Sequence, residues 1–275
     1  MQLFGSMSEP LLRFSAFALM FLVMALLEVA APKRKPAARK ARRWATNLAI
    51  TAIDTTVVRL MAALAVPLVA VAAALWAEQQ GIGLLNLVVW PAWVEFIVAF
   101  VVLDLAVWLQ HLASHKVPLL WRLHQMHHSD IDFDVTTAIR FHPVEIGLSM
   151  LYKVVWVLAL GASALAVVLF EMILNGSSMF NHANIALPAW LDRLLRVLIV
   201  TPDMHRVHHS VEYREHDSNY GFNLSVWDRL FATYTLAPEK GHQGMTIGLS
   251  AYQTEEPTRL LWCLVLPFRA RKTAA

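Results

Sequence analysis

The chain has 275 residues, of which 57% are hydrophobic and 16% are charged, and it carries a formal net charge of +3 at pH 7. Soluble domains carry about 25% charged residues, so this composition argues against a soluble domain and favours a membrane-embedded one. Cys263 is the only cysteine, which excludes an intramolecular disulfide, and the small, local excess of positive charge gives no reason to expect nucleic-acid binding.

The first apolar segment, residues 11–31, is long enough to cross a bilayer as a helix, which needs about 20 residues. Its apolar run is longer than that of a signal peptide and further apolar segments follow, so we expect it to be retained. The basic run PKRKPAARKARR follows at 32–43. Nucleic acid or acidic lipid could bind such a run. We favour a cytoplasmic loop that obeys the positive-inside rule, which places the N-terminus outside.

Two more spans are predicted before the first histidines. The second lies within residues 46–76 and runs outward, with Asp54 and Arg59 facing protein or the interface because a lipid-exposed charge is costly. A short outer turn near 78–81 leads to residues 84–109, which return inward. The inner end of this third span delivers His111 to the cytoplasmic face.

Histidines crowd at the end of the third span and again much farther along the chain. Of the twelve histidines, five lie in HLASHKVPLLWRLHQMHH at 111–128 and three in HRVHH at 205–209. Their spacings are i, i+4 in HLASH and i, i+3, i+4 in HQMHH and HRVHH, so on helices each set shares one face. Each motif therefore directs two or three ring nitrogens toward a common point, which favours metal binding through neutral imidazole.

If both histidine clusters serve one site, the chain between them must enter and leave the membrane on the same side. Its apolar part, about 146–175, is shorter than two full spans, so we predict a tight helical hairpin that turns near Gly161 and enters only part of the bilayer. Two short spans in a thin bilayer are the alternative. Residues 188–200 resemble an amphipathic helix at the interface or a surface helix of the cap. The tail 258–270 is too short to span and should pack on the membrane face.

Eight clustered histidines exceed the four ligands of a tetrahedral zinc site and suit two metals that share a site. Zinc has no redox chemistry, so a role in oxygen activation would require iron or a similar metal. The apolar setting indicates a substrate that partitions into lipid.

The motifs HLASH, HQMHH and HRVHH, in this order behind membrane spans, resemble the histidine boxes of the fatty acid hydroxylase and sterol desaturase superfamily. The resemblance covers about residues 100–235 and includes three further segments, RFHPVE at 140–145, FNHAN at 180–184 and NYGFNLSVWDRLFATY at 219–234. It implies an integral membrane di-iron oxygenase that hydroxylates or desaturates a lipid with dioxygen and two electrons. The electrons would come from a separate protein, either cytochrome b5-like or a ferredoxin with its reductase.

The resemblance also implies that all eight box histidines are metal ligands. One metal would be bound by His111, His124, His127, His205 and His208. The other would be bound by His115, His128 and His209, with His182 of FNHAN as the candidate that completes its coordination.

Three more histidines have weaker assignments. His142, which precedes Pro143, could be a metal ligand or a hydrogen-bonding residue near the substrate, His216 could orient the last box, and His242 is expected to be exposed. Metal-bound imidazoles usually donate their other N–H to a carboxylate or carbonyl. The candidates near the boxes for that role are Asp104, Asp130, Glu145, Asp203, Asp217 and Asn219.

The sequence therefore predicts an all-α integral membrane helical bundle with about four membrane-embedded segments and a cytoplasmic histidine-rich helical cap. Its parts would be N-terminal spans at 1–100, a hydroxylase-like domain at 101–236 and a tail at 237–275. We expect a lipid hydroxylase or desaturase that uses two iron ions and dioxygen, in a multi-pass protein of the cell inner membrane. The alternative is a non-enzymatic membrane metal binder or transporter, although transporters usually place their ligands near the bilayer midplane.

Overall fold

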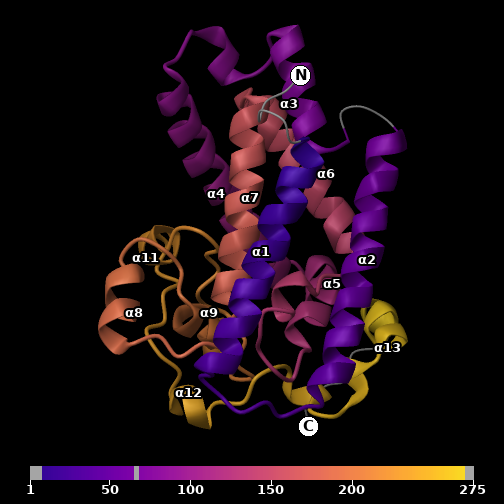
Figure 1. Ribbon diagram of the computed structural model, residues 1–275, viewed down its shortest axis with the longest axis vertical. Helices are drawn as coiled ribbons and strands as arrows, with labels where there is room; N and C mark the ends of the chain where they lie inside the picture. The colour runs from indigo at the N-terminus through magenta and orange to yellow at the C-terminus, as the bar shows by residue number, and fades with distance from the viewer. Residues whose placement is uncertain (1–7, 65–67, 270–275) are drawn as a thin grey trace.

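The computed structural model describes residues 8–64 and 68–269, and within them the fold is a helical bundle with no strand (Figure 1). Five of the helices are long and apolar enough to cross a membrane, namely α1 (Glu9–Ala30), α2 (Lys40–Leu64), α4 (Ala92–Lys116), α6 (Pro143–Leu160) and α7 (Ala164–Asn181). The all-helical prediction is confirmed. These five candidate spans compare with about four predicted membrane-embedded segments, and each arm of the predicted hairpin is 18 residues long, about 27 Å of helix.

The predicted second span matches α2, which covers residues 46–64 of the predicted range and begins earlier, at Lys40. Helix α2 ends at Leu64, the chain is extended at Val69, and a separate helix, α3 (Ala70–Gln80), follows. Residues 65–67 of that prediction lie outside the described residues. The alanines of α3 are buried, and this small face lets the helix pack closely against α6 and α7. Asp54 is buried as expected, whereas Arg59 is exposed.

The predicted turn between α6 and α7 is confirmed. Gly161 ends α6 with a left-handed φ of 69°, and Ser163 caps the N-terminus of α7 by accepting a hydrogen bond from the Ala166 amide. Gly83, in the connection between α3 and α4, lies against this turn, and a Cβ atom at residue 83 would lie 2.2 Å from the Gly161 nitrogen. Two glycines are therefore required where these connections cross.

Shorter helices build a polar end on the bundle. Most of them lie beside or below the lower ends of the long helices (Figure 1). The shorter helices from residue 118 onward are α5 (Pro118–His128), α8 (Ala189–Leu195), α9 (Pro202–His208), α10 (Tyr213–His216), α11 (Val226–Leu230), α12 (Gly241–Gly244) and α13 (Leu260–Val265). Single 3-10 turns occur at Leu84–Leu87, Thr137–Ile139, Ser250–Tyr252, Glu256–Thr258 and Leu266–Phe268. Helix α13 buries Trp262 and Cys263 in a cluster with Ile50 and Met126, while Leu261 remains exposed. Residue 270, the last of the predicted tail segment, lies outside the described residues.

Buried ion pairs join the start of α2 to the loop that follows α5. The Arg43 guanidinium donates to the carboxylates of Asp130 and Asp134, and both of its pairs are almost fully buried. Nearby, Arg140 donates to the Asn47 side chain and to the Met126 carbonyl. Because a buried charge without a partner is strongly unfavourable, these contacts fix the loop beneath the histidines.

Candidate metal centre

Four helices bring the histidines together. The last turns of α4 carry His111 and His115, the end of α5 carries His124, His127 and His128, and α9 with its C-cap carries His205, His208 and His209. His182 is the C-cap residue of α7 and lies among them. The predicted convergence of three boxes that are distant in sequence is therefore confirmed.

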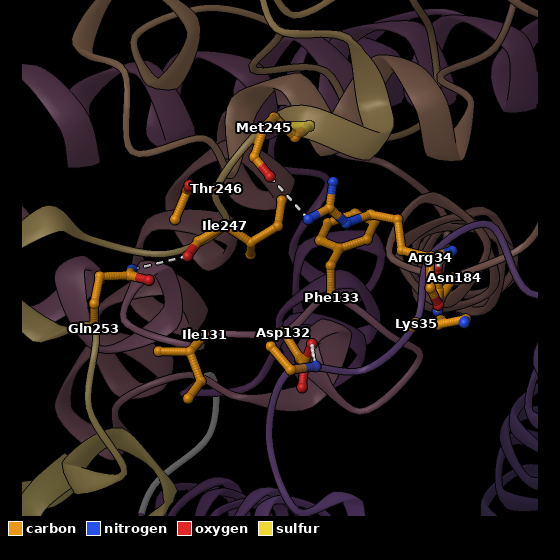
Figure 2. Close-up of a pocket in the computed structure, with 11 residues that line it drawn as sticks. Arg34, Lys35, Ile131, Asp132, Phe133, Asn184, Met245, Thr246, Ile247 and Gln253 are labelled. Carbon is orange, nitrogen blue, oxygen red and sulfur yellow. Dashed lines mark hydrogen bonds between the residues drawn. The ribbon is translucent and has the colours of Figure 1, made fainter.

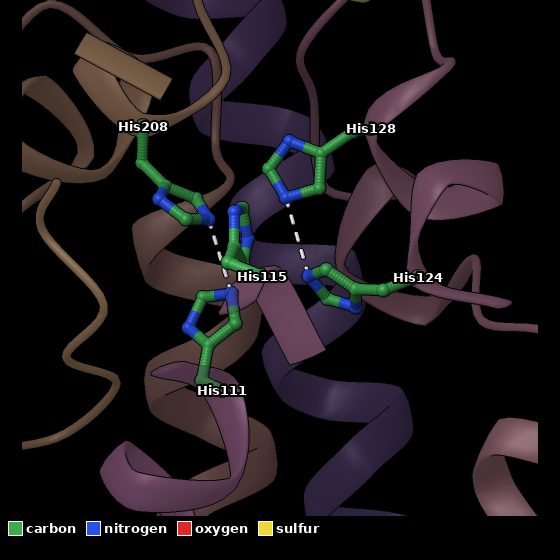
Figure 3. Close-up of side chains that lie close together, drawn as sticks. All are labelled: His111, His115, His124, His128 and His208. Atoms are coloured by element: carbon green, nitrogen blue, oxygen red, sulfur yellow. Dashed lines mark hydrogen bonds between the residues drawn. The ribbon is translucent and has the colours of Figure 1, made fainter. Parts of the chain in front are cut away.

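The first group contains five of these histidines. One ring nitrogen from each of them lies within 4.8 Å of the others, and the residues are His111, His115, His124, His128 and His208. The Nε2 atoms of His111 and His208 are 3.0 Å apart, and those of His124 and His128 are 3.2 Å apart. Figure 3 shows the five rings facing a common centre.

The second group contains four fully buried histidines, His127, His182, His205 and His209, under the same 4.8 Å limit. The Nε2 atom of His182 lies 3.3 Å from that of His127 and 3.1 Å from that of His205. The two groups are adjacent, since the ring centroids of His128 and His209 are 4.5 Å apart. Together the groups contain the nine predicted ligand histidines.

The grouping of the histidines corrects the prediction. His127 and His205 were assigned with His111 but lie in the second group, while His115 and His128 lie in the first group. The reason is helical geometry. Residues four apart in sequence are only about 40° apart around a helix axis, so both face the same group of histidines.

Helix α5 contributes its i, i+4 pair, His124 and His128, to the first group and its i+3 residue, His127, to the second. Helix α9 does the reverse, since His205 and His209 join the second group and His208 joins the first.

Backbone carbonyls fix the tautomers of four imidazoles. Nδ1 of His111 lies 2.7 Å from the Tyr220 oxygen, and Nδ1 of His208 lies 2.6 Å from the Ser218 oxygen. In the second group, Nδ1 of His127 and His182 contact the carbonyls of Arg140 and Ser178, at 3.2 and 2.8 Å. A carbonyl can only accept, so each of these neutral rings carries its proton on Nδ1 and presents an unprotonated Nε2.

Two pairs of Nε2 atoms therefore face each other without a proton to share. These are His111 with His208 at 3.0 Å and His127 with His182 at 3.3 Å. Two nitrogen ligands about 2.0–2.1 Å from one ion would be roughly 2.8–3.4 Å apart at right-angle or tetrahedral geometry. Facing lone pairs at this spacing repel each other unless a cation lies between them, so the donor set fits one metal ion in each group.

Further ring nitrogens are buried without a hydrogen-bond partner among the described residues. They include Nε2 of His115, Nδ1 of His128 and both nitrogens of His209. A buried polar atom without a partner is costly, and metal coordination would satisfy several of these atoms. An all-imidazole donor set suits zinc, copper, iron or nickel better than magnesium or calcium.

Burial keeps these histidines neutral. Desolvation lowers the pKa of His205, His208 and His209 well below the ordinary value of 6.5, and neighbouring histidines add to the shift. Desolvation also lowers the pKa of His182, to about 4, although the Ser178 carbonyl opposes the shift. At neutral pH the rings are thus in the form that binds metal.

Among the predicted hydrogen-bond partners, Glu145 contacts a histidine of the first group through its side chain, since its Oε1 atom lies 2.6 Å from Nδ1 of His124. The other predicted carboxylates have different partners. Asp104 accepts from Asn223 and Trp227, Asp203 pairs with Arg206 and Lys33, and Asp217 accepts from the Tyr220 hydroxyl.

Asp130, another candidate, pairs with Arg43 instead of a histidine. The Asn219 amide donates to the carbonyls of Met204 and Thr235, which ties α9 to the chain that follows it. The carbonyls of Tyr220 and Ser218 were not predicted as partners, because no side-chain type marks a backbone carbonyl as an acceptor.

The three remaining candidate histidines lie outside both groups. His142 caps α6, with Nδ1 accepting from the Val144 amide and Nε2 lying 3.1 Å from the Leu264 carbonyl. His216 packs on the first group, with its ring centroid 4.6 Å from that of His128. The expectation that His242 is exposed was wrong, because its side chain is 17% exposed and lies 3.6 Å from Asp203.

Phe133 lines a polar cavity of about 230 Å³ (Figure 2) and also contacts the second group. Its ring centroid is 5.0 Å from that of His209 and 5.4 Å from that of His182, and the Arg206 guanidinium lies over the ring. Arg34, whose guanidinium donates to the Met245 carbonyl, also lines the cavity. Sequence reasoning missed Phe133 because an aromatic residue outside a histidine motif is usually a core residue.

A family model described as fatty acid hydroxylase matches residues 96–233, half of the chain. Alkylglycerol monooxygenase of Homo sapiens is 29% identical over 158 residues, which are 56% of this chain and 34% of that protein. Ornithine lipid hydroxylase OlsE of Rhizobium tropici is 27% identical over 149 residues, 54% of this chain and 44% of that protein. Fatty acid hydroxylase vlmA of Lecanicillium sp is 27% identical over 177 residues, which are 57% of this chain and 46% of that protein. The chain thus spans less than half the length of these relatives, and no solved structure is significantly similar to it.

Proposed function

The chain belongs to the fatty acid hydroxylase family, and from that premise we propose that it is a membrane-bound lipid oxygenase that uses two iron ions. The observation that supports this most directly is the facing Nε2 pair in each histidine group, His111 with His208 and His127 with His182. Each pair has the spacing of two ligands on one ion. When bound, the two irons supply the redox chemistry that activates dioxygen.

The protein residues would bind the two irons, orient their ligands and exclude water from them. The candidate ligands lie on four helices or at their C-caps, and their rings are packed against one another inside the protein. The carbonyls of Tyr220 and Ser218 orient His111 and His208, and Glu145 orients His124. Phe141 stacks on His127 with ring centroids 4.5 Å apart and keeps water from that ring.

The reaction that we propose is hydroxylation. One oxygen atom of dioxygen is inserted into a C–H bond of the substrate, and the other is reduced to water by two electrons and two protons. The names of the relatives, alkylglycerol monooxygenase and ornithine lipid hydroxylase, support a hydroxylase acting on a lipid. We propose a bilayer lipid as the substrate, and a separate cytochrome b5-like protein or ferredoxin and reductase as the electron donor.

We place the histidines on the cytoplasmic side of the cell inner membrane. The support is the contact between the basic loop and the polar end of the bundle, where Lys33 pairs with Asp203 and Arg34 donates to the Met245 carbonyl. The basic loop and the histidines therefore share one end of the molecule, and the positive-inside rule assigns that end to the cytoplasm.

The test is to purify the protein, load it with ferrous iron, and supply a lipid extract with dioxygen and a chemical reductant. We expect about two irons per chain and a lipid product heavier by one oxygen atom, which carries the label when isotopic dioxygen is used. His128→Ala should lose activity and about one of the two irons, because only the first group contains this residue, whereas His242→Ala, outside both groups, should keep its activity and both irons. Full activity of His128→Ala, or metal uptake into vesicles without any oxidised lipid, would rule the proposal out.

A further inference from the structure

The segments around α8 and α11 carry large apolar side chains that the bundle does not cover. Leu194, Val197 and Leu198 are 63–70% exposed, Trp190 is 62% exposed, and Leu230 is 65% exposed. We call this set, together with Phe231, the α8–α11 face. Soluble surfaces rarely expose a contiguous apolar patch of this kind without a partner.

Backbone pairing makes these residues one surface. The Ser225 amide donates to the Leu198 carbonyl, and the Val200 amide donates to the Asn223 carbonyl, both at 3.0 Å. An isolated bridge joins Ile199 to Leu224 between these two bonds. The chain after α8 is thus fixed alongside the chain before α11, which places the two segments side by side.

The position of this face along the bundle indicates what covers it. In Figure 1, α8 and α11 lie at the same height along the long axis as the lower part of α1. The lower part of α1 itself exposes Leu26 (59%) and Val29 (73%), so the lipid-facing surface of the spans extends to that level. The α8–α11 face therefore lies level with lipid rather than with the aqueous phase.

The lobe that carries this face also has a polar end. Lys240 and Glu212 form an exposed ion pair beside α12, and Figure 1 shows α12 below α8, at the lower end of the molecule. The exposed apolar residues thus belong to the segments around α8 and α11, and this exposed ion pair lies beside α12, at the lower end of the molecule. Trp190 and the exposed Arg193 suit the interface between these zones, since indole rings and long cationic side chains are favoured at the headgroup level.

We propose that the α8–α11 face inserts into the bilayer leaflet next to the histidine end, so that the lobe is an interfacial membrane anchor in addition to the spans. The anchor is joined to the histidines, because Asp192 of α8 accepts a 2.6 Å hydrogen bond from Thr201, the N-cap residue of α9. Insertion would hold α9, which carries His205 and His208, at a fixed depth beneath the leaflet. This inference does not depend on the catalytic proposal.

The experiment uses single cysteines that carry an environment-sensitive fluorophore in the full-length protein. The natural Cys263 is fully buried, so the parent chain provides the labelling blank. Leu194→Cys and Leu230→Cys report on the α8–α11 face, Leu22→Cys on the exposed surface of α1, and Glu239→Cys on the polar end. Each protein is reconstituted in phosphatidylcholine–phosphatidylglycerol vesicles, with or without brominated acyl chains.

We expect the labels at residues 194 and 230 to emit at shorter wavelength and several-fold more strongly than the label at residue 239. Brominated lipid should quench these two labels as it quenches the label at residue 22. Emission like that at Glu239 from both positions would overturn the inference. Blue-shifted emission without bromine quenching, together with crosslinking between two Leu194→Cys chains, would also overturn it, because a second copy would then cover the face.

Discussion

The Nδ1 atom of His124 lies 2.6 Å from the Oε1 atom of Glu145. His124 is in the last turns of α5, and Glu145 is in the first turn of α6, two residues after the helix-starting Pro143. The start of α6 thus places a carboxylate behind a histidine whose Nε2 faces His128. Such a carboxylate holds the imidazole in one tautomer and makes its other nitrogen a stronger ligand.

Replacing Glu145 should therefore weaken metal binding in the first group. Glu145→Leu is expected to lower metal affinity by about 10–100-fold, the usual effect of losing such a partner. Glu145→Gln should be milder, because its amide oxygen can still accept from Nδ1. Competitive metal titration measures both. Glu95→Gln is the control, since Glu95 accepts from the Ser163 amide far from the histidines, and an unchanged affinity in Glu145→Leu would contradict the prediction.

His182 and His142 were both candidate ligands, and the structure predicts different results for their removal. His182→Ala should reduce the metal content from about two ions to about one per chain, because only the second group contains this residue. His142→Ala should keep both ions and lose roughly 1 kcal/mol of stability, since its ring caps α6. Metal analysis and unfolding in detergent separate the two effects. Loss of a metal from His142→Ala alone would reverse the assignment.

The sequence was sufficient to predict which histidines converge, because the i, i+3 and i+4 spacings place them on helix faces. It was also sufficient for the turn at Gly161, because glycine adopts the left-handed conformation of a helix C-cap without a steric penalty. The grouping of the histidines could not be predicted, because it depends on how α5 and α9 are rotated about their axes when they pack. That rotation decides whether an i, i+4 pair or an i+3 residue faces a given group.

The contacts that orient the histidines were also beyond the sequence. The carbonyl that binds His111 belongs to Tyr220, and its direction follows from the fold of the chain after Asn219, which has a positive φ of 53°. The separate helix α3 was also not predicted, although the sequence contains a signal for it. Pro67 lies between Leu64 and Ala70, and proline does not continue a helix without a kink or break.

Acid should destabilise the metal-free protein. Burial lowers the pKa of His182 and His216 to about 4 in the folded chain, from an ordinary value of 6.5. Between these values the unfolded chain binds protons that the folded chain does not, so stability is full above pH 6.5 and falls as the pH drops toward 4. Unfolding of the metal-free protein in detergent from pH 7.5 to 4.5 measures this slope.

The same pKa shifts predict that metal binding at pH 7.5 releases almost no protons from the histidines, because the rings are already neutral. Calorimetry in buffers of different ionisation enthalpy counts the protons released. Release of several protons per metal, or a stability that does not change down to pH 5, would show that the rings are charged in the folded, metal-free chain.

Two adjacent arginines at the start of α2 should differ sharply in their contribution to stability. Arg43 is buried with Asp130 and Asp134, whereas Arg42 reaches the exposed Glu255 at 3.5 Å. Arg43→Ala leaves two buried carboxylates without their cation and should cost about 3–5 kcal/mol of unfolding free energy. Arg42→Ala should cost about 1 kcal/mol or less, because a surface ion pair is screened by water and salt.

Denaturant unfolding in detergent, followed by helical circular dichroism, measures the difference between the two arginine variants. Because Asp130 and Asp134 belong to the loop beneath the second histidine group, Arg43→Ala should also weaken metal binding, and Arg42→Ala should leave it unchanged. Equal losses of stability in the two variants would mean that the buried pairs do not hold this loop. The retention of both metals by a destabilised Arg43→Ala chain would show instead that the histidines are positioned without it.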